Sequence, residues 1–264
     1  MKKEKKVTLK SQRESTLYTS SLILHGNNKL LDFDNPKTGE RIRYAQYNTR
    51  AVEDCPFATD GCKGVCYATK GNHMFPSVIE SRERSFLETR KDNFAEMMVY
   101  TINVEKQSKR YKDSTMLIRL HESGDFYSVQ YLRKWIQIWK ATENVSGLHT
   151  TFYTKSFPFF LMLNDDEKAF INHLLKTDKI TMNLSTDETM STEQKRNYLK
   201  MKATYPLANT YRITTEPHEN ANKCDCADCG KCGTCNHSNG TDTEVVLHSV
   251  STSEREEFKR KAKK

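Results

Sequence analysis

Six short runs rich in β-branched, aromatic and other apolar residues alternate with longer stretches of helical periodicity along this chain. Alternating strands and helices build right-handed βαβ units, and successive units form a parallel sheet. This predicts an α/β fold, either doubly wound or curled into a barrel. The predicted strands are 42–48, 115–120, 149–153, 179–184, 208–214 and 244–249, and the predicted helices are 77–106, 129–143, 165–176, 191–203 and 253–262.

The segment before the first strand predicts a cap on the sheet. Residues 21–34 read as a hairpin through Gly26-Asn27-Asn28, because these residue types favour tight turns. No internal repeat or low-complexity linker interrupts the chain, so one domain is expected. Its predicted parts are a basic tail and hairpin cap at 1–41, a body at 42–252 that includes a cysteine-rich insert at 222–238, and a C-terminal basic helix or tail at 253–264.

The net charge of +8 comes mostly from the two ends of the chain. Residues 1–10 hold five Lys and one Glu, and residues 254–264 hold six Lys or Arg and three Glu. Such ends are typical of solvated or frayed tails, which could make weak, salt-dependent contact with nucleic acid. There is neither a signal peptide nor a run of about 18 apolar residues, so we expect a cytoplasmic protein without a membrane partner.

All eight cysteines lie in two groups, which predicts metal binding. In a cytoplasmic chain, clustered thiols are typical of metal ligands rather than of disulfides. The first group could bind zinc, with His73 or a cysteine of the second group as fourth ligand, or a four-iron four-sulfur (4Fe-4S) cluster with one open iron. The first group is Cys55, Cys62 and Cys66, and the second is Cys224, Cys226, Cys229, Cys232 and Cys235.

The second group is too compact for a zinc ribbon, whose two cysteine pairs stand roughly 15–20 residues apart. Its last four cysteines follow one another at intervals of three, similar to the ferredoxin-type spacing around a cubic cluster. This favours an iron–sulfur cluster over zinc, with Cys224 as a spare or substitute ligand.

Polar residues follow most of the predicted strands. Serine, threonine and aspartate there are often ordinary helix caps. The carboxyl ends of parallel strands are nevertheless where α/β proteins bind ligands, so their collection at one edge predicts a functional site. The segments are His121-Glu122-Ser123-Gly124-Asp125, Thr154-Lys155-Ser156, Ser185-Thr186-Asp187 and Thr215-Glu216.

The stretch YNTRAVEDCPFATDGCKGVCYA, with RLHESGDFYSVQYLRKWIQI, FYTKS, NLSTD and the late cysteines, resembles the phage gene product 88 family. That family in turn resembles radical S-adenosylmethionine enzymes. The resemblance spans about residues 42–250 and implies a partial (βα)6 TIM-type barrel. One difference is the spacing in the cysteine loop, where the gaps are six and three residues instead of the usual three and two.

The resemblance also implies roles for individual residues. Cys55, Cys62 and Cys66 would bind a 4Fe-4S cluster, and the second group would bind another. Ser123, Gly124 and Asp125 match a Gly-Gly-Glu type motif that meets the amino group of S-adenosylmethionine. Ser185 and Asp187 match polar residues that contact this cofactor after the fourth strand.

The expected activity is therefore reductive cleavage of S-adenosylmethionine to act on an unknown substrate. Lys155 and His121 are the predicted catalytic residues, as charged or titratable groups expected near that substrate. The alternative is a non-catalytic zinc or iron–sulfur protein of a phage or mobile element that binds nucleic acid. That alternative explains the basic tails but gives no role to the polar strand ends.

Overall fold

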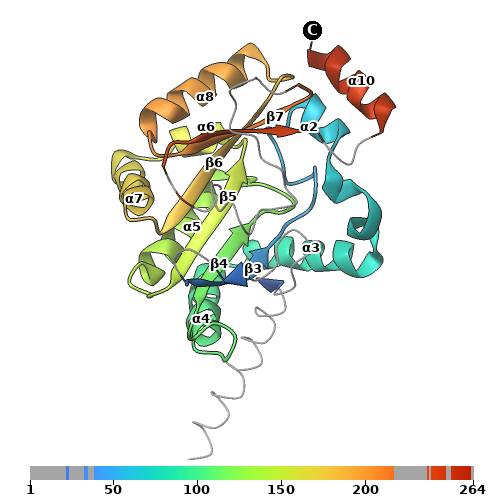
Figure 1. Ribbon diagram of the computed structural model, residues 1–264. Coiled ribbons are helices and arrows are strands. Elements are labelled where there is room, and N and C mark those ends of the chain that lie inside the picture. Colours follow the sequence, from blue (N-terminus) through green and yellow to red (C-terminus); the bar gives the residue numbers. More distant parts are fainter. Residues whose placement is uncertain are drawn as a thin grey trace, which may run out of the picture.

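A computed structural model describes residues 22–23, 33–34, 39–216, 237, 239–247 and 251–262. Six parallel strands form one sheet in which each strand pairs with the next one along the chain (Figure 1). The predicted α/β fold with a six-stranded parallel sheet is confirmed, since every predicted strand overlaps an observed one. The strands are β3 (Arg41–Tyr47), β4 (Thr115–Leu120), β5 (Leu148–Thr154), β6 (Ile180–Asp187), β7 (Asn209–Thr214) and β8 (Asp242–Val246).

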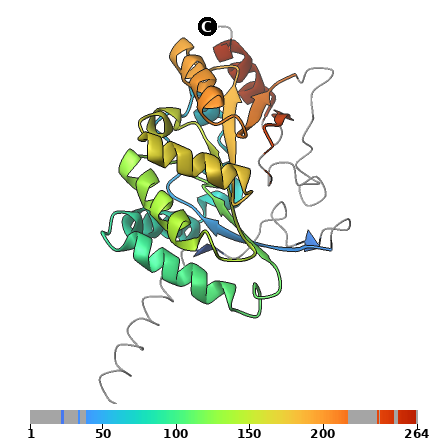
Figure 2. The ribbon, with the colours of Figure 1, turned by 90° about the vertical axis from the view of Figure 1, so that its left-hand side faces the viewer.

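Helices cover one face of this sheet. When parallel strands pair in sequence order, right-handed crossovers all pass over the same side. Figures 1 and 2 show α4 (Phe94–Lys106), α5 (Val129–Thr142), α7 (Asp165–Lys176) and α8 (Thr192–Thr204) in a row on that side. This single-sided winding is consistent with a partial barrel. The doubly wound alternative places helices on both faces.

The two faces of the sheet differ in chemistry. Side chains that face the helices are apolar and fully buried, among them Met116, Ile118, Leu120, Phe152, Met182 and Leu184. The opposite face carries polar and aromatic groups that contact one another. Arg119 lies over the ring of Tyr153, Tyr153 meets Tyr211, and Asn183 accepts a hydrogen bond from Asn209 at 3.2 Å.

Two short strands extend the sheet beyond β3. β1 (Leu22–Ile23) and β2 (Phe33–Asp34) each pair antiparallel with β3. The predicted hairpin turn at Gly26-Asn27-Asn28 lies outside the described residues, and so do residues 1–21. Most of the predicted insert at 222–238, including all five of its cysteines, also lies outside them.

The prediction of a single helix over 77–106 is wrong. The structure divides it into α3 (Pro76–Thr89) and α4, because the chain turns at 90–93 to bury Phe94 against the sheet. Lys134 of α5 donates hydrogen bonds of 2.8 Å to the carbonyls of Thr89 and Lys91 at this break. A cation at a helix C-terminus stabilises carbonyl groups that lack helical partners.

The helix predicted at 253–262 is confirmed as α10 (Thr252–Ala262). Because α10 packs on the molecule, the expectation of a solvated or frayed tail is wrong for these residues. Phe258 is 1% exposed and lies against Gly61 of α2 (Asp60–Gly64), where a Cβ would stand 2.7 Å from its ring. Lys70 and Glu254 form an ion pair across the same contact. Figure 1 shows α10 beside α2.

Candidate functional site at the carboxyl end of the sheet

The first cysteine group lies in the loop after β3. Cys55, Cys62 and Cys66 are free thiols of intermediate exposure. Burial raises the pKa of Cys55 and of Cys62, and neighbouring thiolates raise both further. Metal binding would favour the thiolate forms that burial disfavours.

The three thiols of this loop are of a ligand type that both zinc and a 4Fe-4S cluster accept. In the part of the chain that the structure describes, no three His, Cys, Asp or Glu side chains converge on a common point. Zinc is bound at ligand distances of about 2.0–2.3 Å. The thiolates of a 4Fe-4S cluster each bind a different iron. His73, a possible fourth zinc ligand, instead contacts Arg82, with 2.8 Å between Nδ1 and Nη2.

A buried carboxylate fixes the start of the loop. Asp54 is 2% exposed and accepts hydrogen bonds from the Arg50 amide at 2.8 Å and from Arg50 Nη2 at 2.7 Å. The Arg50 guanidinium also lies 3.5 Å from the centre of the Phe86 ring. Val52, which lies between Arg50 and Asp54 in the sequence, has φ of +68°, a strained value for a β-branched residue. Its carbonyl accepts the N–H of Cys55 at 3.1 Å.

Two threonines join α2 to the end of β6. Thr59 caps α2, where its hydroxyl accepts the Cys62 amide at 2.9 Å and donates to Asp187 Oδ2 at 2.7 Å. Thr189 accepts the Gly61 amide at 3.1 Å and donates to Asp187 Oδ1 at 2.6 Å. The carboxylate of Asp187 therefore holds the helix that carries Cys62. Sequence reasoning missed both threonines, because nothing local identifies a partner 128 residues away.

Lys155 completes this network from β5. Its Nζ lies 3.1 Å from Asp187 Oδ2 and donates to Ser185 Oγ at 2.8 Å. Burial alone would lower the pKa of Lys155, but the negative charges of Cys62, Asp187 and Asp125 raise it overall. Burial likewise opposes ionisation of Asp187, and Lys155 with the two threonines holds the pKa of that carboxyl below its ordinary value. The pair is therefore charged at neutral pH.

The Ser-Gly-Asp segment after β4 links neighbouring loops. Ser123 Oγ donates to the Thr49 carbonyl at 2.7 Å. Gly124 has φ of +83°, and a Cβ there would lie 2.0 Å from Thr49 Oγ1. Asp125 accepts hydrogen bonds from Thr154 Oγ1 at 2.7 Å and from the Lys155 amide at 2.8 Å. Burial raises the pKa of Asp125 to about 6.

The structure thus gathers Ser123, Gly124, Asp125, Lys155, Ser185 and Asp187 around the cysteine loop. Comparison with known families agrees with one part of the sequence resemblance, the likeness to the phage gene product 88 family. The family described as Gene product 88 matches residues 21–238. This chain belongs to the gene product 88 family. No curated protein and no solved structure matches it.

In this gene product 88 protein, His121 lies apart from the network. It is 5% exposed, has φ of +59°, and its Nε2 lies 3.0 Å from the Tyr131 hydroxyl of α5. Burial lowers the pKa of His121 to about 3, so the ring is neutral. Its Nδ1 has no hydrogen-bond partner among the residues that the structure describes. The ring faces the helices, and its catalytic role stays a prediction.

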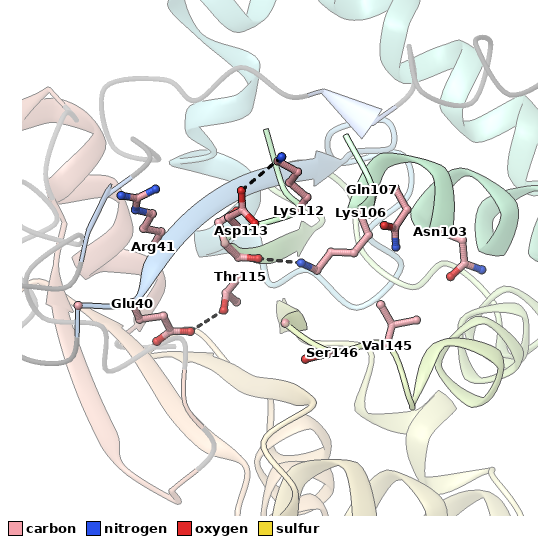
Figure 3. A pocket seen from close by; sticks show the side chains of 13 residues that line it. Glu40, Arg41, Asn103, Lys106, Gln107, Lys112, Asp113, Thr115, Val145 and Ser146 are labelled. Carbon is pink, nitrogen blue, oxygen red and sulfur yellow. Dashed lines mark hydrogen bonds and ion pairs between the residues drawn. The ribbon is translucent and has the colours of Figure 1, made fainter. Parts of the chain in front are cut away.

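Two cavities lie at opposite ends of the sheet of the gene product 88 protein. One of about 380 Å³ lies beside the cysteine loop, where Phe57, Lys155 and Gln194 contribute to its lining. Another of about 680 Å³ lies at the amino end of the strands, between Glu40, Lys106 and Ser146 (Figure 3). The larger cavity is lined by none of the residues predicted to form the site. The smaller one adjoins the network and is the better candidate for ligand entry.

None of the helices within the described ranges of this gene product 88 protein combines the length and the apolar character that crossing a bilayer requires.

Proposed function

We propose that this protein is an iron–sulfur protein that cleaves S-adenosylmethionine reductively, as the enzymes it resembles do. One observation carries the proposal: three free thiols share a loop at the carboxyl end of the first of six parallel strands. Ligands of α/β proteins bind at this end of the sheet. The polar network around the loop supports the proposal further.

The finer architecture belongs to the same proposal. The sheet would be a partial (βα)6 barrel with an N-terminal cap at 1–41. The insert at 222–238 would bind a second cluster through its cysteines, in the manner of auxiliary clusters.

When bound, a 4Fe-4S cluster with an open iron supplies one electron and a binding position for the amino and carboxylate groups of S-adenosylmethionine. The chain supplies binding, orientation and exclusion of water. Oδ1 of Asp125 accepts hydrogen bonds from the Phe126 amide and from Thr154 Oγ1. Oδ2 accepts one, from the Lys155 amide, so Asp125 would have room on Oδ2 to orient the cofactor ammonium. A carboxylate accepts about four such bonds. Lys155 would hold a positive charge beside the site.

Anaerobic purification followed by iron, sulfide and zinc analysis tests the metal content. We expect about four irons per cluster. Serine at Cys55, Cys62 and Cys66 should remove about four irons and abolish release of 5′-deoxyadenosine from the reduced protein. The matched control, serine at Cys226, Cys229, Cys232 and Cys235, should remove iron but leave the signal that S-adenosylmethionine perturbs in electron paramagnetic resonance.

Two results would contradict the proposal. Stoichiometric zinc without sulfide would favour the non-catalytic nucleic-acid-binding protein. A paramagnetic signal indifferent to S-adenosylmethionine would leave an iron–sulfur protein whose clusters are structural.

A further inference from the structure

We propose that Lys155, Asp187 and Thr59 form a positioning network that holds Cys62 as a cluster ligand and fixes the charge beside its sulfur. This inference rests on the proposed function, because it concerns the same cluster. The three residues come from the end of β5, from the end of β6 and from the cap of α2. None of them would bind iron itself.

The mechanical part of the inference follows from the hydrogen bonds. Asp187 Oδ2 receives both Lys155 Nζ at 3.1 Å and Thr59 Oγ1 at 2.7 Å. Thr59 in turn accepts the Cys62 amide at 2.9 Å. The carboxylate of a rigid sheet strand thereby controls the first turn of a five-residue helix. Such a short helix is marginal by itself, so its position depends on these contacts.

The electrostatic part follows from burial. The side chains of Lys155 and Asp187 are 6% and 0% exposed, so water screens them little. Both charges lie in the hydrogen-bonded chain that ends at the Cys62 amide, since Lys155 meets Asp187, Asp187 accepts from Thr59, and Thr59 accepts from Cys62. Charges and hydrogen bonds near cluster sulfurs set the reduction potential. Since reduction adds negative charge, a nearby cation raises the potential and a nearby anion lowers it.

A purely structural salt bridge predicts something different. Removing either partner would then loosen the loop, with no opposite effects on the potential. Lys106 provides a matched control, since it is another buried lysine, 7% exposed, but at the amino end of the sheet. Its Nζ donates hydrogen bonds to the carbonyls of Tyr111 and Ser114. Figure 3 shows Lys106 beside the cavity at that end.

The test uses full-length protein and two readouts. Redox titration of the paramagnetic signal that is lost in Cys62→Ser should show a lower potential in Lys155→Met and a higher one in Asp187→Asn. We expect about a tenfold change in the reduction equilibrium for each, which is about 59 mV for one electron. In metal-free protein, alkylation of Cys62 followed by mass spectrometry should be about tenfold faster in Thr59→Val, because one of the bonds fixing α2 is lost.

The outcomes separate the two proposals. Wild-type protein without iron and sulfide overturns the proposed function. A cluster whose potential moves in the same direction, or not at all, in Lys155→Met and Asp187→Asn overturns the positioning network. Lys106→Met should change neither readout, and an equal effect there would also overturn it.

Discussion

The two ends of the sheet each bury a lysine, and the two lysines are held in different ways. At the carboxyl end, Lys155 reaches a carboxylate and a hydroxyl on the neighbouring strand. At the amino end, Lys106 reaches two carbonyls that lie five and eight residues further along its own segment. Charge partners raise the pKa of Lys155, whereas burial lowers the pKa of Lys106.

This difference distinguishes a lysine of the candidate site from a lysine that closes a loop. Lys106 satisfies backbone groups between α4 and β4, which any local fold of the segment would need. Lys155 joins segments far apart in sequence and ends at the loop that carries the cysteines. Buried ion pairs contribute little net stability relative to apolar residues, so such a pair is better explained by a requirement for charge at that place.

The largest expected effect is on the buried ion pair. Lys155→Met leaves Asp187 buried without its cation and should destabilise the metal-free protein by about 3–5 kcal/mol. Lys106→Met leaves only carbonyls without a donor and should cost about 1–2 kcal/mol. Urea unfolding under anaerobic conditions measures both. The double variant Lys155→Met with Asp187→Asn should cost less than the sum of the single changes. Equal losses of stability in Lys155→Met and Lys106→Met would contradict the difference between the two ends of the sheet.

Glycines give a second contrast between the two ends. Gly124→Ala combines an unfavourable positive φ with a Cβ only 2.0 Å from Thr49 Oγ1, so we expect a loss of about 2–5 kcal/mol. Gly39 at the amino end has φ of +70°, but a Cβ there would have nothing within 4 Å, so Gly39→Ala should cost only about 1 kcal/mol. The melting temperatures of Gly124→Ala and Gly39→Ala in thermal unfolding measure the two losses. Adding Thr49→Ala should recover part of the loss at Gly124 and none at Gly39.

Asp125 should make stability depend on pH in an unusual direction. Its pKa is about 6 in the folded protein and 3.8 ordinarily, so the folded state binds the proton more tightly. The resulting stability is present below pH 3.8 and is lost as pH rises through about 6. The loss is about 3 kcal/mol, at about 1.36 kcal/mol per pKa unit. Urea unfolding of wild type and Asp125→Asn across this range isolates the effect, and a constant difference between them would contradict it.

Much of the fold could be predicted because its signals are local. Alternating apolar runs placed all six parallel strands, and the helix predicted at 191–203 overlaps α8 (Thr192–Thr204). The break at 90–93 could not be read from periodicity, since both halves of 77–106 have helical character. Only the burial of Phe94 against the sheet decides it.

The candidate site was predictable in its residue types but not in its connections. Polar residues at strand ends pointed to Asp125, Lys155 and Asp187, and the structure brings these together. The roles of Thr59 and Thr189 depend on hydrogen bonds across 128 residues, which no spacing rule reveals. Likewise, a positive charge at the chain end predicted a solvated tail, although one buried phenylalanine fixes α10 onto α2.

The smallest expected effect concerns backbone strain beside the cysteines. Val52 has φ of +68° in the turn before Cys55, while Asp178 at the amino end has φ of +53°. Aspartate and asparagine tolerate this region, but a β-branched residue does not. Val52→Asn should therefore raise the stability of the metal-free protein by about 1 kcal/mol, and Asp178→Asn should leave the backbone contribution unchanged. Calorimetric melting measures both.

Strain retained at functional sites usually has a purpose. The strained turn at Val52 directly precedes Cys55, and its carbonyl accepts the Cys55 amide. If the turn aims Cys55 at the proposed cluster, Val52→Asn will melt at a higher temperature yet bind less iron. A variant that gains stability and keeps full iron would show that the strain serves no purpose in metal binding.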